Sequence, residues 1–156
     1  MFVQRFSEGR GADTIKVAAE MKAWAKSQGI KVIHALIDAN ATPFEACKDA
    51  ARFSAIVNAM GKDGAAECAQ LLEDSGDEAT FTRRPGTSGC VARTALAAAD
   101  AEYVVTTISD GCADPDEELH RIMLGKVLNN RGYVAAADEI RKRFEEAAGG
   151  GGGGAD

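Results

Sequence analysis

The sequence predicts an α/β protein in three layers, with a mainly parallel sheet and helices on both faces. A helix over about 13–28 is followed at once by a near-continuous apolar run at 30–37. Such a run after a helix is typical of a strand buried on both faces of a parallel sheet. The strongest strand signal, at 103–108, also follows a helical stretch and precedes another. This alternation of helix and strand indicates the fold class.

The first predicted helix begins at Asp13, whose side chain is expected to cap it, and ends before Gly29. The later elements are predicted from apolar periodicity and from the positions of glycine and proline. They are helical stretches at 44–60 and 64–73, a strand at 79–82, a helix from Ser88 or Gly89 to Asp100, the strand at 103–108, a helix capped by Asp114, a weak strand at 133–135 and a helix at 137–147.

The length of 156 residues suits one domain, which we place at residues 1–147. Six consecutive glycines begin at Gly149 and have no side chains to bury. We therefore expect residues 148–156 to form a disordered, glycine-rich tail.

The net charge of -6 argues against nucleic acid or an anionic membrane surface as the main partner, since both attract a basic face. No apolar run is long enough to span a membrane. The segment Met1–Arg10 does not resemble a signal peptide, so the expected location is cytoplasmic. We expect a small-molecule substrate as the partner, and the sequence leaves a homo-oligomer open.

The cysteines predict no metal centre and no other cofactor. There are four, Cys47, Cys68, Cys90 and Cys112, with no close pair, and the chain has 2 histidines. Structural zinc sites usually draw ligands from close cysteine pairs. In the cytoplasm these residues are expected to be free thiols, most of them buried as small apolar groups.

Cys90 is the cysteine whose surroundings suggest chemistry. It follows a glycine-rich turn, Gly86-Thr87-Ser88-Gly89, at the expected start of a helix. A helix N-terminus offers unpaired backbone N–H groups and about half a positive charge, which favour a thiolate. The same N–H groups can hold an oxyanion, and Gly89 would let a substrate carbonyl approach. The alternative is a buried cysteine in an alanine-rich packing helix.

The C-terminal half of the sequence resembles the isochorismatase-like cysteine hydrolases. That family carries its nucleophilic cysteine in a T-x-x-C-V turn, followed by a T-A helix, a strand that ends in D-x-x-A-D and a helix that bears histidine. The matching segments are Thr87-Ser88-Gly89-Cys90-Val91, Arg93-Thr94-Ala95, Asp110-Gly111-Cys112-Ala113-Asp114, His120, Gly125-Lys126-Val127 and Arg131-Gly132-Tyr133-Val134. A looser match extends upstream through 29–34 and 82–84.

The resemblance implies a Rossmann-like, isochorismatase-like fold and hydrolysis of a small amide or a vinyl ether. It makes Cys90 the nucleophile and places Thr87, Ser88 and Gly89 against the substrate. The family's triad also contains an aspartate and a lysine. Phe2 stands where the aspartate would fall, and Arg83 best matches the lysine, with charge and hydrogen bonds but without a compact ammonium.

The match also implies a reduced number of strands. The family's first strand is not found, nor is the helix–strand unit before the cysteine, a loss of roughly 30 residues. These two strands lie at the centre of the family's six-stranded sheet, so the strands near 30–37 and 79–82 would be separated from those near 103–108 and 133–135. Three outcomes stay open: the strands re-pair into a smaller sheet, partner chains fill the gap, or a truncated or spliced product folds poorly.

Two other functions compete with the hydrolase. One is a catalytically impaired or inactive family remnant, that is, a pseudoenzyme or interaction subunit. The other is an anion-binding module that uses Arg83, Arg84 and the helix start near Ser88. Among further candidates, Asp110 could orient the site, although a turn-capping aspartate is the simpler explanation, and His34 is expected to be a satisfied core histidine rather than a base. Asp114, Asp116 and His120 are better explained by the helix start than by a metal.

Overall fold

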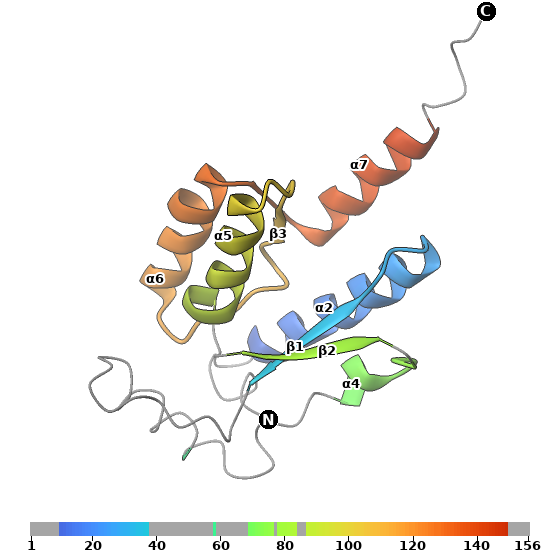
Figure 1. Ribbon diagram of the computed structural model, residues 1–156, viewed down its shortest axis with the longest axis horizontal. Coiled ribbons are helices and arrows are strands. Elements are labelled where there is room, and N and C mark those ends of the chain that lie inside the picture. Colours follow the sequence, from blue (N-terminus) through green and yellow to red (C-terminus); the bar gives the residue numbers. More distant parts are fainter. Residues whose placement is uncertain (1–9, 38–57, 59–68, 77, 84–86, 150–156) are drawn as a thin grey trace, which may run out of the picture.

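A computed structural model describes residues 10–37, 58, 69–76, 78–83 and 87–149 of the chain. Its elements form two halves that lie against each other (Figure 1). The N-terminal half contains α2 (Arg10–Ser27), β1 (Ile33–Ile37), α4 (Ala69–Leu72) and β2 (Ala79–Arg83). The C-terminal half contains η1 (Thr87–Val91), α5 (Ala92–Asp100), β3 (Thr106–Ile108), α6 (Glu117–Ile122), η2 (Met123–Val127), η3 (Leu128–Asn130), β4 (Tyr133–Ala135) and α7 (Ala137–Gly149).

Helix α2 ends where the sequence predicts. Gly29 adopts a left-handed conformation with φ of 72°, which costs glycine little because it has no Cβ. The Gly29 N–H donates to the Lys26 carbonyl at 3.0 Å, and the Ile30 N–H donates to that of Ala25 at 2.9 Å. The predicted start is wrong, because the helix already includes Arg10 and Asp13 therefore lies inside it rather than at its cap.

The two strands of the N-terminal half pair in parallel. Ile33 of β1 lies opposite Ala79 of β2, and Ile37 lies opposite Arg83. Both strands therefore end at the same edge of the sheet. The predicted helices at 44–60 and 64–73 fall mostly outside the described residues, and α4 is the described part of the second.

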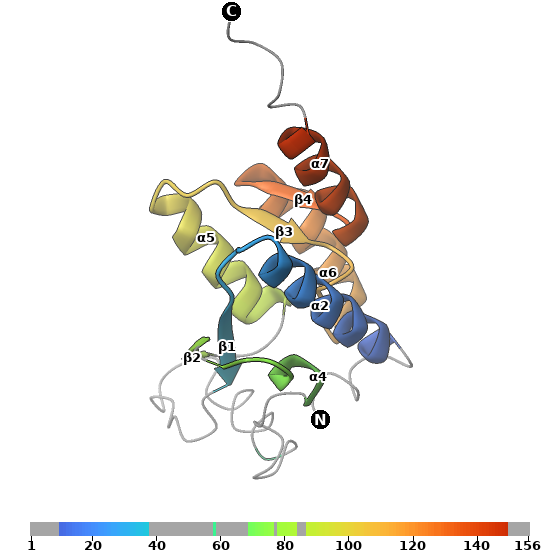
Figure 2. The same ribbon diagram turned by 90° about the vertical axis from the view of Figure 1, so that its right-hand side faces the viewer.

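The C-terminal half repeats this arrangement. Strands β3 and β4 are parallel, with Thr106 opposite Tyr133 and Ile108 opposite Ala135. In both views β3 lies between α5 and α7 (Figures 1 and 2). The helical segment that connects β3 to β4 starts with α6. Asp116 caps this helix by accepting the Leu119 N–H at 2.9 Å. The prediction of Asp114 as the cap is wrong: it lies two residues before the cap, and its carboxylate accepts the N–H of Asp116 itself at 3.2 Å.

The predicted fold class is confirmed, and so is the predicted division of the strands. The described strands form two separate parallel pairs, β1–β2 and β3–β4. Re-pairing of these four strands into one smaller sheet is therefore not what the described residues adopt. Contact between the halves includes the rings of Trp24 on α2 and Phe144 on α7, which meet edge to face with centroids 5.2 Å apart.

Among the residues that the structure describes, the buried apolar side chains come from both halves. They are Ile15, Met21, Ala92, Leu128 and Ala137. Among the described helices, none combines the length and the apolar character that crossing a membrane requires.

Candidate functional site

Cys90 lies in the first turn of the helix that the sequence predicts. The turn η1 (Thr87–Val91) is π-helical and continues directly into α5. The predicted start near Ser88 or Gly89 is thus correct to within two residues. Cys90 and Gly89 are both partly exposed, so the cysteine is not buried in the middle of an alanine-rich helix. That position is the one the nucleophile hypothesis requires.

The π-helical turn η1 lies at the N-terminal end of a longer helical stretch. Gly89 and Cys90 belong to that turn. The dipole of the following helix points its positive end at the same place. A negatively charged sulfur or oxygen is therefore favoured here.

A second cysteine, which the sequence analysis did not single out, lies near Cys90. Burial raises the pKa of the Cys112 thiol to about 11, and negative charge at Cys90 and Asp110 raises it as well. This electrostatic coupling indicates that the three side chains occupy one neighbourhood. Neither Cys90 nor Cys112 forms a disulfide. Cys112 therefore stays protonated at neutral pH, and of the two thiols Cys90 is the candidate nucleophile.

Asp110 has a structural partner that explains its position. Its Oδ1 accepts the N–H of Ala137, the first residue of α7, at 2.9 Å. Asp110 follows β3 and Ala137 follows β4, so this bond ties together the carboxyl ends of the two strands. The sequence predicted a cap on a turn, whereas the structure shows Asp110 accepting from the start of a helix 27 residues further along the chain. The same carboxylate also contributes negative charge beside Cys112.

The other predicted site residues are only partly described. Arg83 is the last residue of β2, and Thr87 and Ser88 open η1. Their side chains lie outside the described part of the structure, as do Phe2, Cys47 and Cys68. The roles expected for Arg83, Thr87 and Ser88 stay predictions.

The acids near α6 are accounted for by the backbone they bind. Asp116 caps the helix, and Asp114 accepts a backbone N–H within the preceding turn. In the described ranges, no three His, Cys, Asp or Glu side chains are grouped so that they could hold a metal ion.

His34 is a satisfied core histidine, as predicted. Its side chain is 7% exposed, and its Nε2 lies 2.5 Å from Oε2 of Glu78. Lys22 and Lys26 of α2 also reach this carboxylate, at 3.2 Å and 3.0 Å. This cluster was not predicted, although the sequence carries a signal for it: two lysines one helical turn apart, followed by an apolar strand that bears histidine.

Comparison with known proteins agrees with this arrangement. Residues 86–139 match the family model of the isochorismatase domain. This match contains the cysteine turn, both strands of the C-terminal half and the start of α7. Among curated proteins, none is significantly similar in sequence.

A solved structure of an isochorismatase family protein from Burkholderia thailandensis resembles the chain over most of its length. The two superpose with a TM-score of 0.74 at 16% identity, over 86% of this chain and 84% of the other. At that identity the likeness is one of fold. It extends beyond the segment that the family model matches and includes the N-terminal half. The C-terminal half thus matches the isochorismatase domain in sequence, and the chain as a whole has the fold of an isochorismatase family protein.

Proposed function

We propose that the chain is an isochorismatase-family hydrolase that acts on a small amide or vinyl ether, with Cys90 as its nucleophile in the amide reaction. The observation that carries the proposal is the position of Cys90, partly exposed in the first turn of a helix. Its neighbour Cys112 supports the assignment, because a thiol whose pKa is about 11 does not compete with it at neutral pH.

In the amide reaction the Cys90 thiolate attacks the carbonyl carbon, and the carbonyl oxygen takes up the negative charge. Backbone N–H groups at Gly89 and Cys90 would hold that oxyanion. Collapse of the intermediate breaks the C–N bond, and the leaving nitrogen takes a proton from water. The thioester that remains is hydrolysed by water, which yields the acid and restores the thiol. Hydrolysis of a vinyl ether needs no covalent bond to the cysteine.

Thr87, Ser88 and Arg83 complete the proposed site. Thr87 and Ser88 share the turn with Cys90 and are proposed to contact the substrate. Arg83 ends β2, where carboxyl ends of parallel strands commonly face ligands, and would supply the positive charge that the family takes from lysine. A guanidinium keeps that charge at any working pH.

Thiol labelling tests the proposal directly. Iodoacetamide at pH 7 is expected to modify Cys90 at least about tenfold faster than Cys112, measured by peptide mass spectrometry over time. Unfolding the chain in denaturant should bring the two rates together. Equal and slow labelling in the folded chain would remove the case for a nucleophile and favour the inactive family remnant.

Activity is tested with a panel of small primary amides, with ammonia release as the measurement. Cys90→Ser is expected to lose this activity by at least about a hundredfold. Cys112→Ser is the matched control because it changes a nearby thiol that takes no part in the reaction. Loss of activity in both variants alike would contradict the assignment of Cys90.

A further inference from the structure

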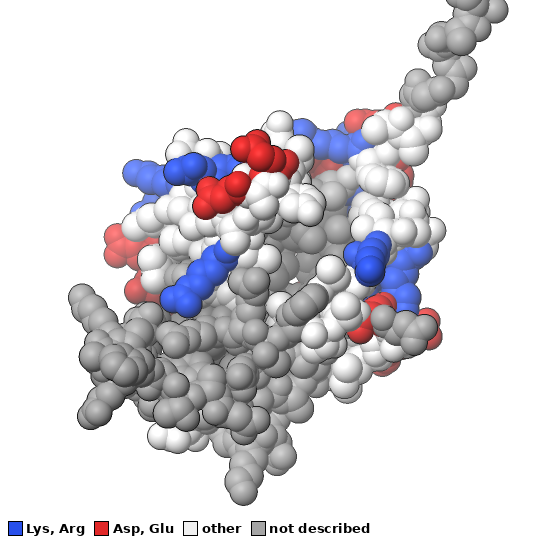
Figure 3. Space-filling model, viewed as in Figure 1, with Lys and Arg blue, Asp and Glu red and all other residues white. Residues whose placement is uncertain are grey.

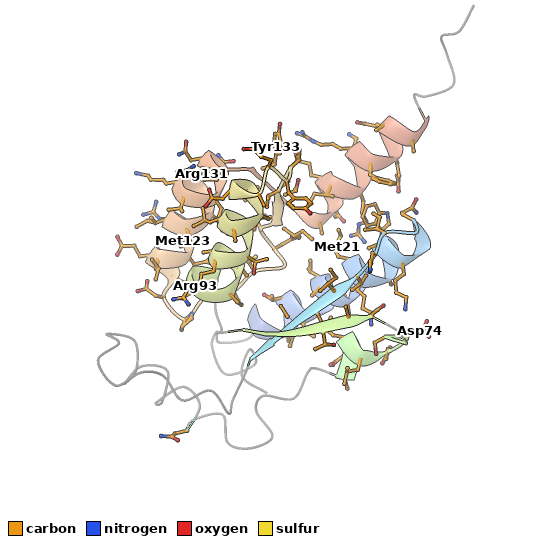
Figure 4. All side chains as sticks on the ribbon, viewed as in Figure 1. Met21, Asp74, Arg93, Met123, Arg131 and Tyr133 are labelled. Atoms are coloured by element: carbon orange, nitrogen blue, oxygen red, sulfur yellow. The ribbon has the colours of Figure 1, made fainter. Side chains whose placement is uncertain are left out.

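The chain between Cys90 and Cys112 runs out along α5 and back along β3. Tyr133, the first residue of β4, lies opposite Thr106, the first residue of β3. Tyr133 lies at the end of α5 away from Arg93, and Arg93 marks the start of that helix, on the turn after Cys90 (Figure 4). Strand β3 therefore runs back towards the start of α5, and it ends on the side of the half where Cys90 lies.

The turn after β3 keeps Cys112 on that side. The Gly111 N–H donates to the Ile108 carbonyl at 3.2 Å, and the Cys112 N–H donates to the Ser109 carbonyl at 3.4 Å, so the backbone folds on itself directly after the strand. Helix α6 follows, starts at the same end as α5 and contacts η1 (Figure 1). The two thiols also share an electrostatic environment, because negative charge at Cys90 raises the pKa of Cys112.

The two thiols differ in reactivity. Cys90 is partly exposed at a helix start that favours its thiolate, whereas burial keeps Cys112 protonated. Oxidants react with the thiolate and not with the thiol. The surface over α5 and α6 carries side chains of both charges (Figure 3), so it does not exclude a small uncharged oxidant such as hydrogen peroxide. Such an oxidant is expected to react first with Cys90.

We propose that Cys90 and Cys112 form a reversible disulfide when a hydroperoxide oxidises Cys90. The Cys90 thiolate attacks one peroxide oxygen and becomes a sulfenic acid, while the O–O bond breaks and the other oxygen takes a proton from solvent and leaves as water. The Cys112 sulfur then attacks the Cys90 sulfur, the S–O bond breaks, and the hydroxide leaves as water with the Cys112 proton. The two thiols lose two electrons, which reduce one hydrogen peroxide to two waters.

Oxidation of Cys90 itself prepares Cys112 for the second step. Burial holds the pKa of Cys112 at about 11, together with negative charge at Cys90 and Asp110. A neutral sulfenic acid lacks the charge of the thiolate, so one of these causes disappears and the pKa falls. The disulfide then protects the sulfur from sulfinic acid, which thiol reductants do not reverse. Its consequence for catalysis rests on the proposed function, since the oxidised sulfur is the proposed nucleophile.

Peptide mapping of the full chain tests the bond without any measurement of activity. Trypsin cleaves after Arg93, between the two cysteines, so the disulfide joins two peptides that are otherwise separate. After brief exposure to hydrogen peroxide and alkylation of the remaining thiols, we expect the peptides of Cys90 and Cys112 to be linked. The oxidised chain should run as a monomer on a non-reducing gel. Dithiothreitol should separate the peptides and restore the labelling of Cys90 by iodoacetamide.

Two variants test the role of Cys112. In Cys112→Ser the sulfenic acid has no thiol to react with, so trapping of oxidised Cys90 by dimedone should rise at least about fivefold over the wild type. The matched control is the double variant Cys47→Ser and Cys68→Ser, which keeps the proposed pair and should form the bond at the wild-type rate.

Three results overturn the proposal: a link from Cys90 to Cys47 or Cys68, a link between two chains, or equal dimedone trapping in the wild type and Cys112→Ser. Failure of this proposal and failure of the proposed function are distinguishable. A chain that forms the bond but hydrolyses no amide counts against the proposed function alone. A chain that hydrolyses amides through Cys90 but forms no bond to Cys112 counts against the disulfide alone.

Discussion

Nε2 of His34 lies 2.5 Å from Oε2 of Glu78, and this contact joins β1 to the residue just before β2. The same Oε2 also pairs with Lys22 of α2, and the other carboxylate oxygen, Oε1, pairs with Lys26. The Lys22 ammonium also donates to the carbonyls of Leu71 and Glu73, at 2.6 Å and 2.7 Å. One acid thus connects α2, β1 and the segment that runs from α4 to β2.

Glu78→Gln should destabilise the N-terminal half more than a surface substitution does. The change removes the negative charge that compensates Lys22, whose side chain is 8% exposed, and a buried charge without its partner is costly. We expect the melting temperature to fall by more than roughly 5 °C. Glu20→Gln is the control, since Glu20 pairs with Lys16 at 3.9 Å on the exposed side of α2 and such pairs contribute little. Equal shifts in the two variants would contradict the role given to Glu78.

The same cluster predicts a loss of stability in acid. Hydrogen bonding from His34, with smaller contributions from Lys26 and Lys22, lowers the pKa of Glu78 from 4.5 to about 2 against the opposing effect of burial. A lowered pKa contributes stability above the unfolded value, near 4.5, and that contribution disappears as the pH falls towards 2. Denaturant titrations between pH 6 and 2 should show this loss. In Glu78→Gln the dependence should be shallower, and an unchanged dependence would contradict the assignment.

Gly132 allows β4 to approach β3. A Cβ at this position would lie 2.5 Å from the carbonyl oxygen of Val105, which is closer than real contacts. Gly132→Ala should therefore push the strands apart and destabilise the chain by about 2–4 kcal/mol in urea titrations. Gly125→Ala is the matched control, because nothing lies within 4 Å of its added methyl group. In that helical position alanine should be neutral or stabilise by up to about 1 kcal/mol.

Element types could be predicted from the sequence because their signals are local. The end of the first helix before Gly29 and the strand at 133–135 each depend on a few adjacent residues, and both are observed. The strand expected at 103–108 is shorter, at Thr106–Ile108, because it extends only as far as its partner β4, which has three residues. Strand length therefore depends on a segment that is distant in the sequence.

The caps show a second limit of local reasoning. Asp114 and Asp116 both lie near the start of α6, so either could cap it. Asp116 is the cap because its carboxylate reaches the N–H of Leu119. The position of Cys90 at the start of a helix could be predicted because the glycine before it and the alanine-rich run after it are its neighbours in the sequence. The proximity of Cys112 to Cys90 could not, since it arises from the packing of the turn after β3 against the start of another helix.

Asp110 links fold stability to the cysteine site, and two substitutions separate these roles. Asp110→Ala removes the acceptor for the Ala137 N–H and should cost about 1 kcal/mol of stability in denaturant titrations. Asp110→Asn keeps an oxygen acceptor and should cost less. Both variants remove a negative charge beside Cys112, so its pKa should fall below the wild-type value of about 11. Alkaline labelling of Cys112 should then begin at lower pH in both variants alike. If labelling in Asp110→Asn followed the wild-type pH profile, the carboxylate would not be acting on Cys112 through its charge.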